Sequence, residues 1–224
     1  MVMRAEADEW AAAGGDGWRP FDLVGNRLCL DFINTQVREK GRHVDQLVDF
    51  RAFVAWLRQT GALDEGMTGD VAARWEGTPE GEDALERARA FRATIRATVD
   101  GIVAGRAVPR ATLDRINDLL RERAGYVQVA HGPDGFERRF HAAVARPIQL
   151  LAPLAEDVGD LLCDGDLALV KRCESPSCVR YFYDTTKNHT RRWCSMGACG
   201  NRAKAADHRR RVATRANPAG GGAR

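Results

Sequence analysis

Apolar residues recur at helical spacing along most of the chain. In residues 49–61, Phe53, Trp56 and Leu57 mark one helix face, Asp49 can cap the start, and Gly61 can end the helix. The same periodicity predicts further helices over residues 26–37, 68–75, 79–104, 109–120 and 146–165. Each should bury an apolar face, such as the stripe Leu113, Ile116, Leu119 and Leu120.

One segment departs from helical periodicity. Residues 125–140 alternate between apolar and polar positions, contain β-branched residues, and carry the turn sequence Gly-Pro-Asp-Gly at 132–135. This pattern predicts a β-hairpin. The body, residues 20–168, is therefore expected to be mainly helical with one small hairpin. Residues 1–19 and 213–224 are expected to be flexible tails.

Four of the six cysteines form two equally spaced pairs. Cys173 and Cys178 are separated by four residues, as are Cys194 and Cys199, and fifteen residues lie between the pairs. Paired thiols at both ends of a short, basic segment favour a tetrahedral zinc site. Disulfides are the competing interpretation, but they need an oxidising compartment and no export signal is evident. The other two, Cys29 and Cys163, lie in apolar stretches and are expected to be buried.

The cysteine segment, residues 169–212, is too short to fold around a core of its own, so a metal is expected to organise it. Residues 178–184 are aromatic and typical of a strand, and residues 191–194 could form its return strand. The aromatic residues of both are expected to pack around the metal. A helix beginning near Cys199 would complete a treble-clef-like finger, with a short hairpin and a basic helix.

Charge is distributed unevenly along the chain. Residues 1–170 hold 21 Lys/Arg and 28 Asp/Glu, a balance of −7, whereas residues 171–224 hold 13 and 3, a balance of +10. A basic end on an acidic body favours a polyanionic partner. The candidate DNA contacts are Arg191, Arg192, Arg202, Lys204, Arg209, Arg210 and Arg211. Asp207 would repel phosphate, so we expect it to turn away from DNA and pair with Arg211.

These motifs resemble a known bacterial family. The tetrad Cys199-Gly200-Asn201-Arg202, with the preceding cysteines, is similar to the CGNR zinc finger. The stretch LCLDFINT, residues 28–35, is similar to the ABATE domain that precedes this finger. The resemblance covers residues 20–212. It implies a transcription regulator, proposed to be stress-induced, in which the finger binds DNA.

A polar stripe interrupts the first predicted helix. Asp31, Asn34 and Thr35 fall at i, i+3 and i+4, so they share one face. They could line a small-molecule pocket, or they could form an internal hydrogen-bonding network, as buried polar groups must. The pattern contains no nucleophile–base pair and no paired carboxylates, and four thiols leave zinc no open position. A catalytic function is therefore not expected.

The sequence thus predicts a mainly α protein with a helical N-terminal domain and a zinc finger that holds one Zn²⁺. No apolar run is long enough to cross a membrane, so we expect a cytoplasmic, bacterial DNA-binding regulator whose body senses a small-molecule effector or forms a homodimer. Two alternatives remain at this point: a protein-interaction module that docks on an acidic partner, and an enzyme with an accessory finger.

Overall fold

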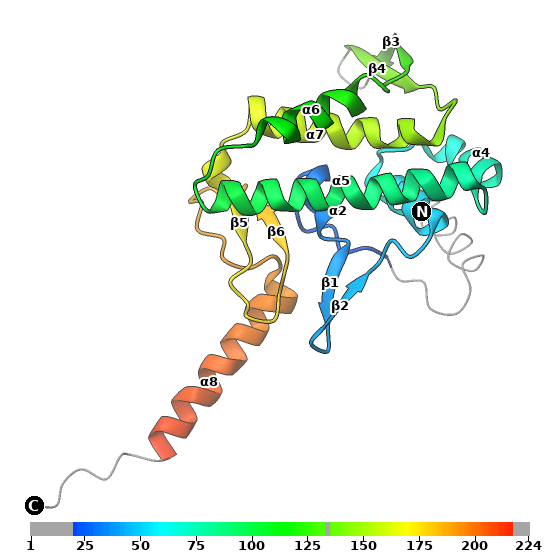
Figure 1. Ribbon diagram of the computed structural model, residues 1–224. Helices are drawn as coiled ribbons and strands as arrows, with labels where there is room; N and C mark the ends of the chain where they lie inside the picture. Colours follow the sequence, from blue (N-terminus) through cyan, green and yellow to red (C-terminus); the bar gives the residue numbers. More distant parts are fainter. Residues whose placement is uncertain (1–19, 133–134, 217–224) are drawn as a thin grey trace, which may run out of the picture.

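The computed structural model describes residues 20–132 and 135–216, with side chains as far as residue 212. Its body is built around the long helix α5 (Pro79–Val103), which packs with α2 (Leu28–Ile33), α3 (Phe50–Thr60) and α4 (Glu65–Trp75) (Figure 1). Helices α6 (Arg110–Leu120) and α7 (Ala152–Cys163) pack on each other beside α5, and the short helix η1 (Pro147–Leu151) precedes α7. The predicted mainly helical fold is confirmed.

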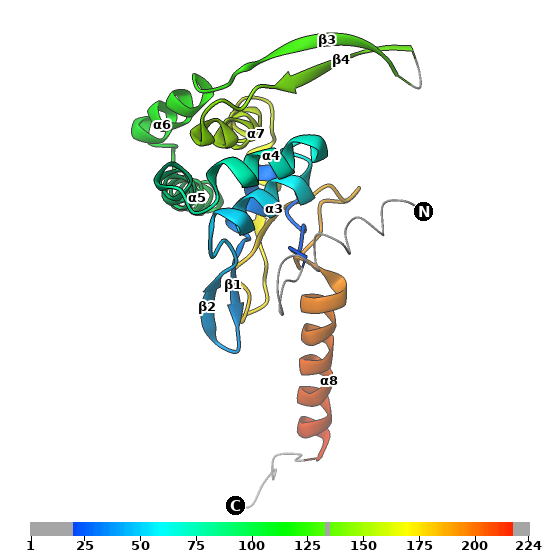
Figure 2. The ribbon, with the colours of Figure 1, turned by 90° about the vertical axis from the view of Figure 1, so that its right-hand side faces the viewer.

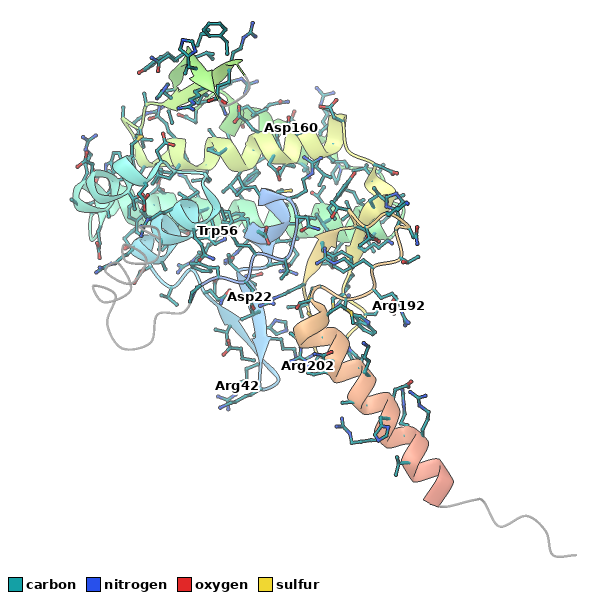
Figure 3. All side chains as sticks on the ribbon, turned by 180° about the vertical axis from the view of Figure 1, so that it is seen from behind. Asp22, Arg42, Trp56, Asp160, Arg192 and Arg202 are labelled. Carbon is teal, nitrogen blue, oxygen red and sulfur yellow. The ribbon has the colours of Figure 1, made fainter. Side chains whose placement is uncertain are left out.

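The core is aromatic where α2 meets α3. Trp56 and Phe32 are fully buried, and their ring centroids lie 5.1 Å apart. Figure 3 shows Trp56 within the body. Helix α3 has the predicted ends, since the Asp49 side chain accepts a 2.7 Å hydrogen bond from the Ala52 amide. At the other end Gly61 has φ 73°, a left-handed conformation that favours glycine.

The helix predicted over residues 26–37 is wrong in its second half. Helix α2 ends at Ile33, and the chain continues into an antiparallel hairpin of β1 (Gln36–Glu39) and β2 (Arg42–Asp45). The Thr35 hydroxyl donates to the Phe32 carbonyl, which satisfies the end of the helix. Lys40 and Gly41 both have positive φ, 47° and 82°, as tight two-residue hairpin turns require.

Two burial predictions are also wrong. Leu113 is 43% exposed, and Thr112 takes the inward position on α6, where its hydroxyl lies 3.4 Å from that of Thr98. A hydroxyl pair therefore replaces the expected apolar contact. Cys163 is exposed because it is the last residue of α7, whereas Cys29 is buried as predicted.

The predicted hairpin of residues 125–140 is present as β3 (Gly125–Gly132) and β4 (Gly135–Ala142). The strands pair in register from Gly125–Ala142 to Gly132–Gly135, and the two turn residues between them lie outside the described residues. Figure 2 shows the hairpin as an arm that extends away from the helices.

After η2 (Leu167–Leu169), strands β5 (Val170–Arg172) and β6 (Tyr181–Tyr183) begin the C-terminal part. The last elements are a short π-helical turn, η3 (Met196–Gly200), and helix α8 (Asn201–Ala216). Strand β6 packs against α2, and β5 packs against α5. Helix α8 extends away from the body, on the side to which the β1–β2 hairpin also points (Figures 1 and 2).

Candidate metal centre and nucleic-acid interface

Four cysteine sulfurs converge at the base of α8. The Sγ atoms of Cys173, Cys178, Cys194 and Cys199 all lie within 4.8 Å of one another. The Cys194 sulfur is 3.7 Å from that of Cys178 and 3.5 Å from that of Cys199. Tetrahedral zinc with Zn–S bonds of about 2.3 Å requires sulfurs about 3.8 Å apart. The cluster therefore fits a single zinc ion.

Electrostatics in the cluster also call for a cation. The pKa of the Cys173 thiol is held far below its usual range because its sulfur accepts hydrogen bonds from Cys178 and Cys194. In turn, donating to Cys173 raises the pKa of Cys178 to about 11 and raises that of Cys194 as well. Among these three thiols, protein groups alone thus favour ionisation of Cys173, and a divalent cation would supply the charge that ionises the other two.

Each cysteine pair is positioned by local backbone hydrogen bonds. In the first loop, the Cys173 amide donates to the Arg180 carbonyl and the Cys178 amide to the Ser175 carbonyl, both at 2.9 Å. In the second, the amides of Cys199 and Gly200 both donate to the Ser195 carbonyl at 3.0 Å. The two loops therefore present their thiols as pairs, as their equal spacing predicts.

The tetrad at residues 199–202 has a structural reason at each position. Cys199 supplies one of the four thiols, and a Cβ on Gly200 would lie 2.7 Å from Met196 Sδ, so a side chain there would require the Met196 side chain to move. Asn201 Nδ2 donates to the Gly197 carbonyl at 3.3 Å. The Arg202 guanidinium donates to Cys199 Sγ at 3.1 Å and so links the first turn of α8 to the cysteine cluster.

The strand partner predicted for this segment is wrong. Strand β6 pairs with β5, from Val170–Tyr183 to Arg172–Tyr181, and residues 191–194 form no strand. The aromatic packing divides accordingly. Phe182 and Trp193 pack against the cysteines, as expected, whereas Tyr181 and Tyr183 pack against the core of the body. Alternate side chains of β6 thus face the metal centre and the body.

A buried carboxylate that the sequence reading missed organises the loop between β6 and Cys194. Asp184 has no exposed surface and accepts hydrogen bonds from Lys171 Nζ (2.7 Å), the Thr186 amide (3.0 Å), the Thr186 hydroxyl (2.6 Å) and the Arg191 amide (2.9 Å). Burial acts to raise its pKa, but these donors hold the pKa far below its usual range. His189 Nδ1 donates to the Asp184 carbonyl at 3.2 Å, and His189 is not among the converging ligands.

Comparison with models of known protein families shows which family the chain belongs to. A model described as "putative stress-induced transcription regulator", ABATE, matches residues 26–165, and a CGNR zinc-finger model matches residues 170–212. The chain belongs to the ABATE family. Both matches confirm the predicted resemblance, and neither family is a family of enzymes. No curated protein matches the chain.

Within the ABATE domain, the polar stripe of α2 forms internal contacts. Asn34 bonds both backbone groups of Tyr181, accepting from its amide at 2.9 Å and donating to its carbonyl at 2.8 Å. Asp31 accepts from the Gly25 amide at 2.7 Å, and Thr35 accepts from Arg92. These are the bonds of an internal network. Through Asn34, the network joins the ABATE domain to the CGNR finger.

The cations expected to contact DNA fall into two groups. Arg191 and Arg202 are engaged within the finger. The Arg191 guanidinium donates to the carbonyls of Val24, Trp193 and Cys194 and stacks 4.1 Å from the Phe182 ring centroid. Arg202 is nevertheless exposed, and the other exposed cations are Arg192, which pairs with Glu174, and Lys204, Arg209, Arg210 and Arg211 on α8. As predicted, Asp207 pairs with Arg211 (3.4 Å), and it also pairs with Arg210 (2.6 Å).

The charges of α8 lie on opposite sides of the helix. At 100° per residue, Arg202 and Arg209 fall within about 20° of one line, Lys204 and Arg211 share a second line roughly 140–180° away, and Arg210 falls between the two lines. Small alanines, including Ala203 and Ala206, lie between them. The helix is thus thin, with long cations along two flanks.

Among the described residues, no helix has the length and apolar character needed to cross a membrane.

Proposed function

We propose that the protein is a zinc-dependent transcription regulator that binds DNA through α8. The observation that carries this proposal is the position of α8, which extends away from the body while bearing Lys204, Arg209, Arg210 and Arg211 on exposed positions (Figure 2). Like charges on one helix repel each other. A polyanion would neutralise that repulsion, and DNA is the polyanion that the family description favours.

The two flanks of α8 suit the major groove. A helix in this groove lies between two phosphate backbones, so cations on opposite sides of the helix can meet both strands. Zinc supports the arrangement because it fixes η3, from which α8 begins. In this proposal, Arg202 and Arg191 hold the finger together, while Lys204, Arg209, Arg210 and Arg211 contact phosphates or base edges.

Salt dependence tests this proposal directly. Binding of a mixed-sequence 30-base-pair duplex to the zinc-loaded full chain is measured by fluorescence anisotropy across a KCl series. Replacing Arg209 and Arg211 with Gln should reduce the slope of log K against log[KCl] by roughly two units, since each phosphate contact contributes about 0.9. The matched control replaces Arg110 and Arg115, which are exposed on α6, with Gln. Equal slopes in both variants would contradict the assignment of α8.

A separate observation supports the homodimer expected from the sequence. One face of the β3–β4 arm exposes apolar side chains, with Val127 at 61%, Val129 at 65% and Phe136 at 77%, and the exposed Arg138, paired with Val129, lies on the same face. Phe140 continues this face to the root of the arm, where it lines a cavity of about 350 Å³. Exposed apolar surface on the order of a few hundred Å² marks interaction sites. We propose that two copies pair through this face, the Phe136 of each entering the cavity of the other.

The spacing along the arm suits such an exchange. Phe136 and Phe140 are four residues apart, about 14 Å along a strand. A twofold axis midway between them sets each Phe136 over the partner's cavity and brings the two Arg138 side chains to the axis, where their like charges oppose the pairing. Light scattering should give about twice the 24.7 kDa chain mass for the wild type and the single-chain mass for a Val129→Ser, Phe136→Ser variant. Replacing Gln128 and Arg139, on the opposite face, should leave the dimer intact. A monomeric wild type would refute the dimer.

The same cavity is our candidate effector site, in place of the α2 stripe, and an effector bound there would compete with the partner's Phe136. Arg123 lies on its wall, ion-paired with Glu156 and stacked 3.7 Å from the Phe140 ring centroid, and Leu28 of α2 lies opposite among its lining residues. A mixed apolar and charged lining of this kind suits a small amphipathic molecule. A thermal-shift screen of such molecules against wild type and Arg123→Gln tests this site.

A further inference from the structure

The β1–β2 hairpin carries a cluster of exposed cations on an otherwise acidic body. Arg38, Lys40 and Arg42 are exposed, and Glu39 is the one acidic residue among positions 38–43, so the segment carries three positive charges minus one, or +2. None of the three cations forms an ion pair within the described part of the chain. The charge of these residues is therefore available to an outside anion.

The root of the hairpin is fixed. Val37 is buried, and Asp45 accepts from Arg92, whose side chain is 1% exposed. At the tip, Arg38 Nε donates to the Gly41 carbonyl across the turn. A two-stranded hairpin with polar exposed faces buries too little surface to stabilise itself. This one is held from its base and presents its cations in a set direction.

The hairpin stands beside the metal centre. A cleft of about 160 Å³ separates the two, with Arg38 and Glu39 among its lining residues on one side and Arg202 and Cys199 on the other. Asp22, also on the lining, is paired with Arg180 at 2.6 Å. Figure 3 shows Arg42 at the hairpin tip and Arg202 at the start of α8, on the same side of the body. A duplex lying along α8 would therefore pass the hairpin.

We infer that the β1–β2 hairpin is a second DNA-contacting element, in which Arg38, Lys40 and Arg42 bind the phosphate backbone next to the segment held by α8. The inference rests on the proposed function of α8. It gives the ABATE domain a direct role in DNA binding, because the hairpin lies within residues 26–165. It also gives one copy of the protein two separated points of contact, which fixes the orientation of α8 on the duplex.

The test compares three double variants of the zinc-loaded full chain on the mixed-sequence 30-base-pair duplex. Arg38→Gln with Arg42→Gln should reduce the salt slope by roughly two units, as Arg209→Gln with Arg211→Gln should. Arg110→Gln with Arg115→Gln removes the same charge from exposed positions of α6 and should leave the slope unchanged. Zinc content and thermal unfolding establish that each variant is folded.

The outcomes separate the two proposals. A reduced slope in the hairpin and α8 variants, with no reduction in the α6 variant, supports both. An unchanged slope in the hairpin variant, with a reduced one in the α8 variant, overturns the hairpin assignment and leaves the function of α8 standing. A wild-type chain that fails to bind the duplex at low salt overturns both.

A second measurement needs no substitution. Acetylation of lysines in the wild-type chain is followed by mass spectrometry with and without saturating duplex. Lys40 and Lys204 should each react several-fold more slowly in the complex. Protection of Lys204 with unchanged reactivity of Lys40 would overturn the hairpin assignment, even where the double variant fails to fold.

Discussion

Replacing Asn34 with alanine should uncouple the two parts of the molecule. Asn34 is 2% exposed and is the side chain that satisfies both the amide and the carbonyl of Tyr181. Tyr181 belongs to the strand that leads from the first cysteine pair, yet its side chain lies in the core of the body. The substitution therefore removes a link between α2 and β6 without touching a zinc ligand.

The magnitude follows from the two backbone groups left unpaired. Leaving a buried donor or acceptor without a partner costs about 1–3 kcal/mol, so the pair should cost roughly 2–5 kcal/mol. For a chain of this length, the corresponding fall in Tm is on the order of 10 °C. Asn34→Asp keeps an acceptor for the Tyr181 amide but has no donor for the carbonyl, and it adds a buried charge. It should be at least as destabilising as alanine.

Urea unfolding of the zinc-loaded protein, followed by tryptophan fluorescence, measures the effect. Asn117→Ala is the matched control, because Asn117 is exposed on α6 and its side chain bonds no buried group. It should change the free energy of unfolding by less than about 0.5 kcal/mol. If Asn34→Ala and Asn117→Ala cost the same, the contact between Asn34 and Tyr181 does not hold the finger to the body.

Three further predictions concern the metal and one carboxylate. The purified wild-type protein should carry one zinc per chain, and the Cys178→Ser variant should carry much less zinc. Metal analysis that shows an equal zinc content in the two proteins would contradict the four-thiolate site. Chelation should abolish hydrogen-exchange protection at the amides of Cys199 and Gly200. Protection should persist at the amide of Tyr181, which donates to Asn34, and at that of Tyr183, which donates to the Gly25 carbonyl. Loss of protection at all four amides would show that β6 depends on zinc. Burial raises the pKa of Asp31 from 3.8 to about 6. The folded state therefore binds the Asp31 proton more tightly than the unfolded state does. Ionisation of Asp31 above pH 6 lowers the free energy of unfolding by up to about 3 kcal/mol. Asp31→Asn should therefore be more stable than wild type at pH 7 and equally stable at pH 4, and a pH-independent difference would refute this.

The sequence allowed the fold class to be predicted because its signals are local. Helix α3 is specified within thirteen residues by Asp49, Gly61 and the apolar positions between them. The β3–β4 hairpin is marked by alternation and a turn sequence. By contrast, the β1–β2 hairpin was hidden because its first strand follows α2 after only two residues, so the apolar run appeared continuous. The Lys40-Gly41 pair was the available signal, since glycine favours the positive φ of such turns.

The metal ligands were predictable for a similar reason, since equal spacing and residue type are visible in a linear sequence. Their surroundings were not. Whether Tyr181 faces the metal or the body depends on the pairing of β6 with β5, and residues 191–194 offered an equally basic and aromatic alternative. The domain boundary proposed at residue 168 stays a prediction, while the contacts of Val170 and Tyr181 with the body show that the finger and the helices share one core.

The residues that sequence reading assigned least well are polar side chains whose partners lie far along the chain. Arg92 falls next to Phe91 on the inward face of α5, and it is nearly as buried as that phenylalanine. Its charge is tolerated there because Asp45 and Thr35, from the hairpin and from the end of α2, both bond its guanidinium. Since an unpaired buried charge would be strongly destabilising, an arginine at a core position implies a fixed acidic partner. Applied to α5, that rule indicates an acidic residue far along the chain. The structure identifies this residue as Asp45, at the base of the β1–β2 hairpin.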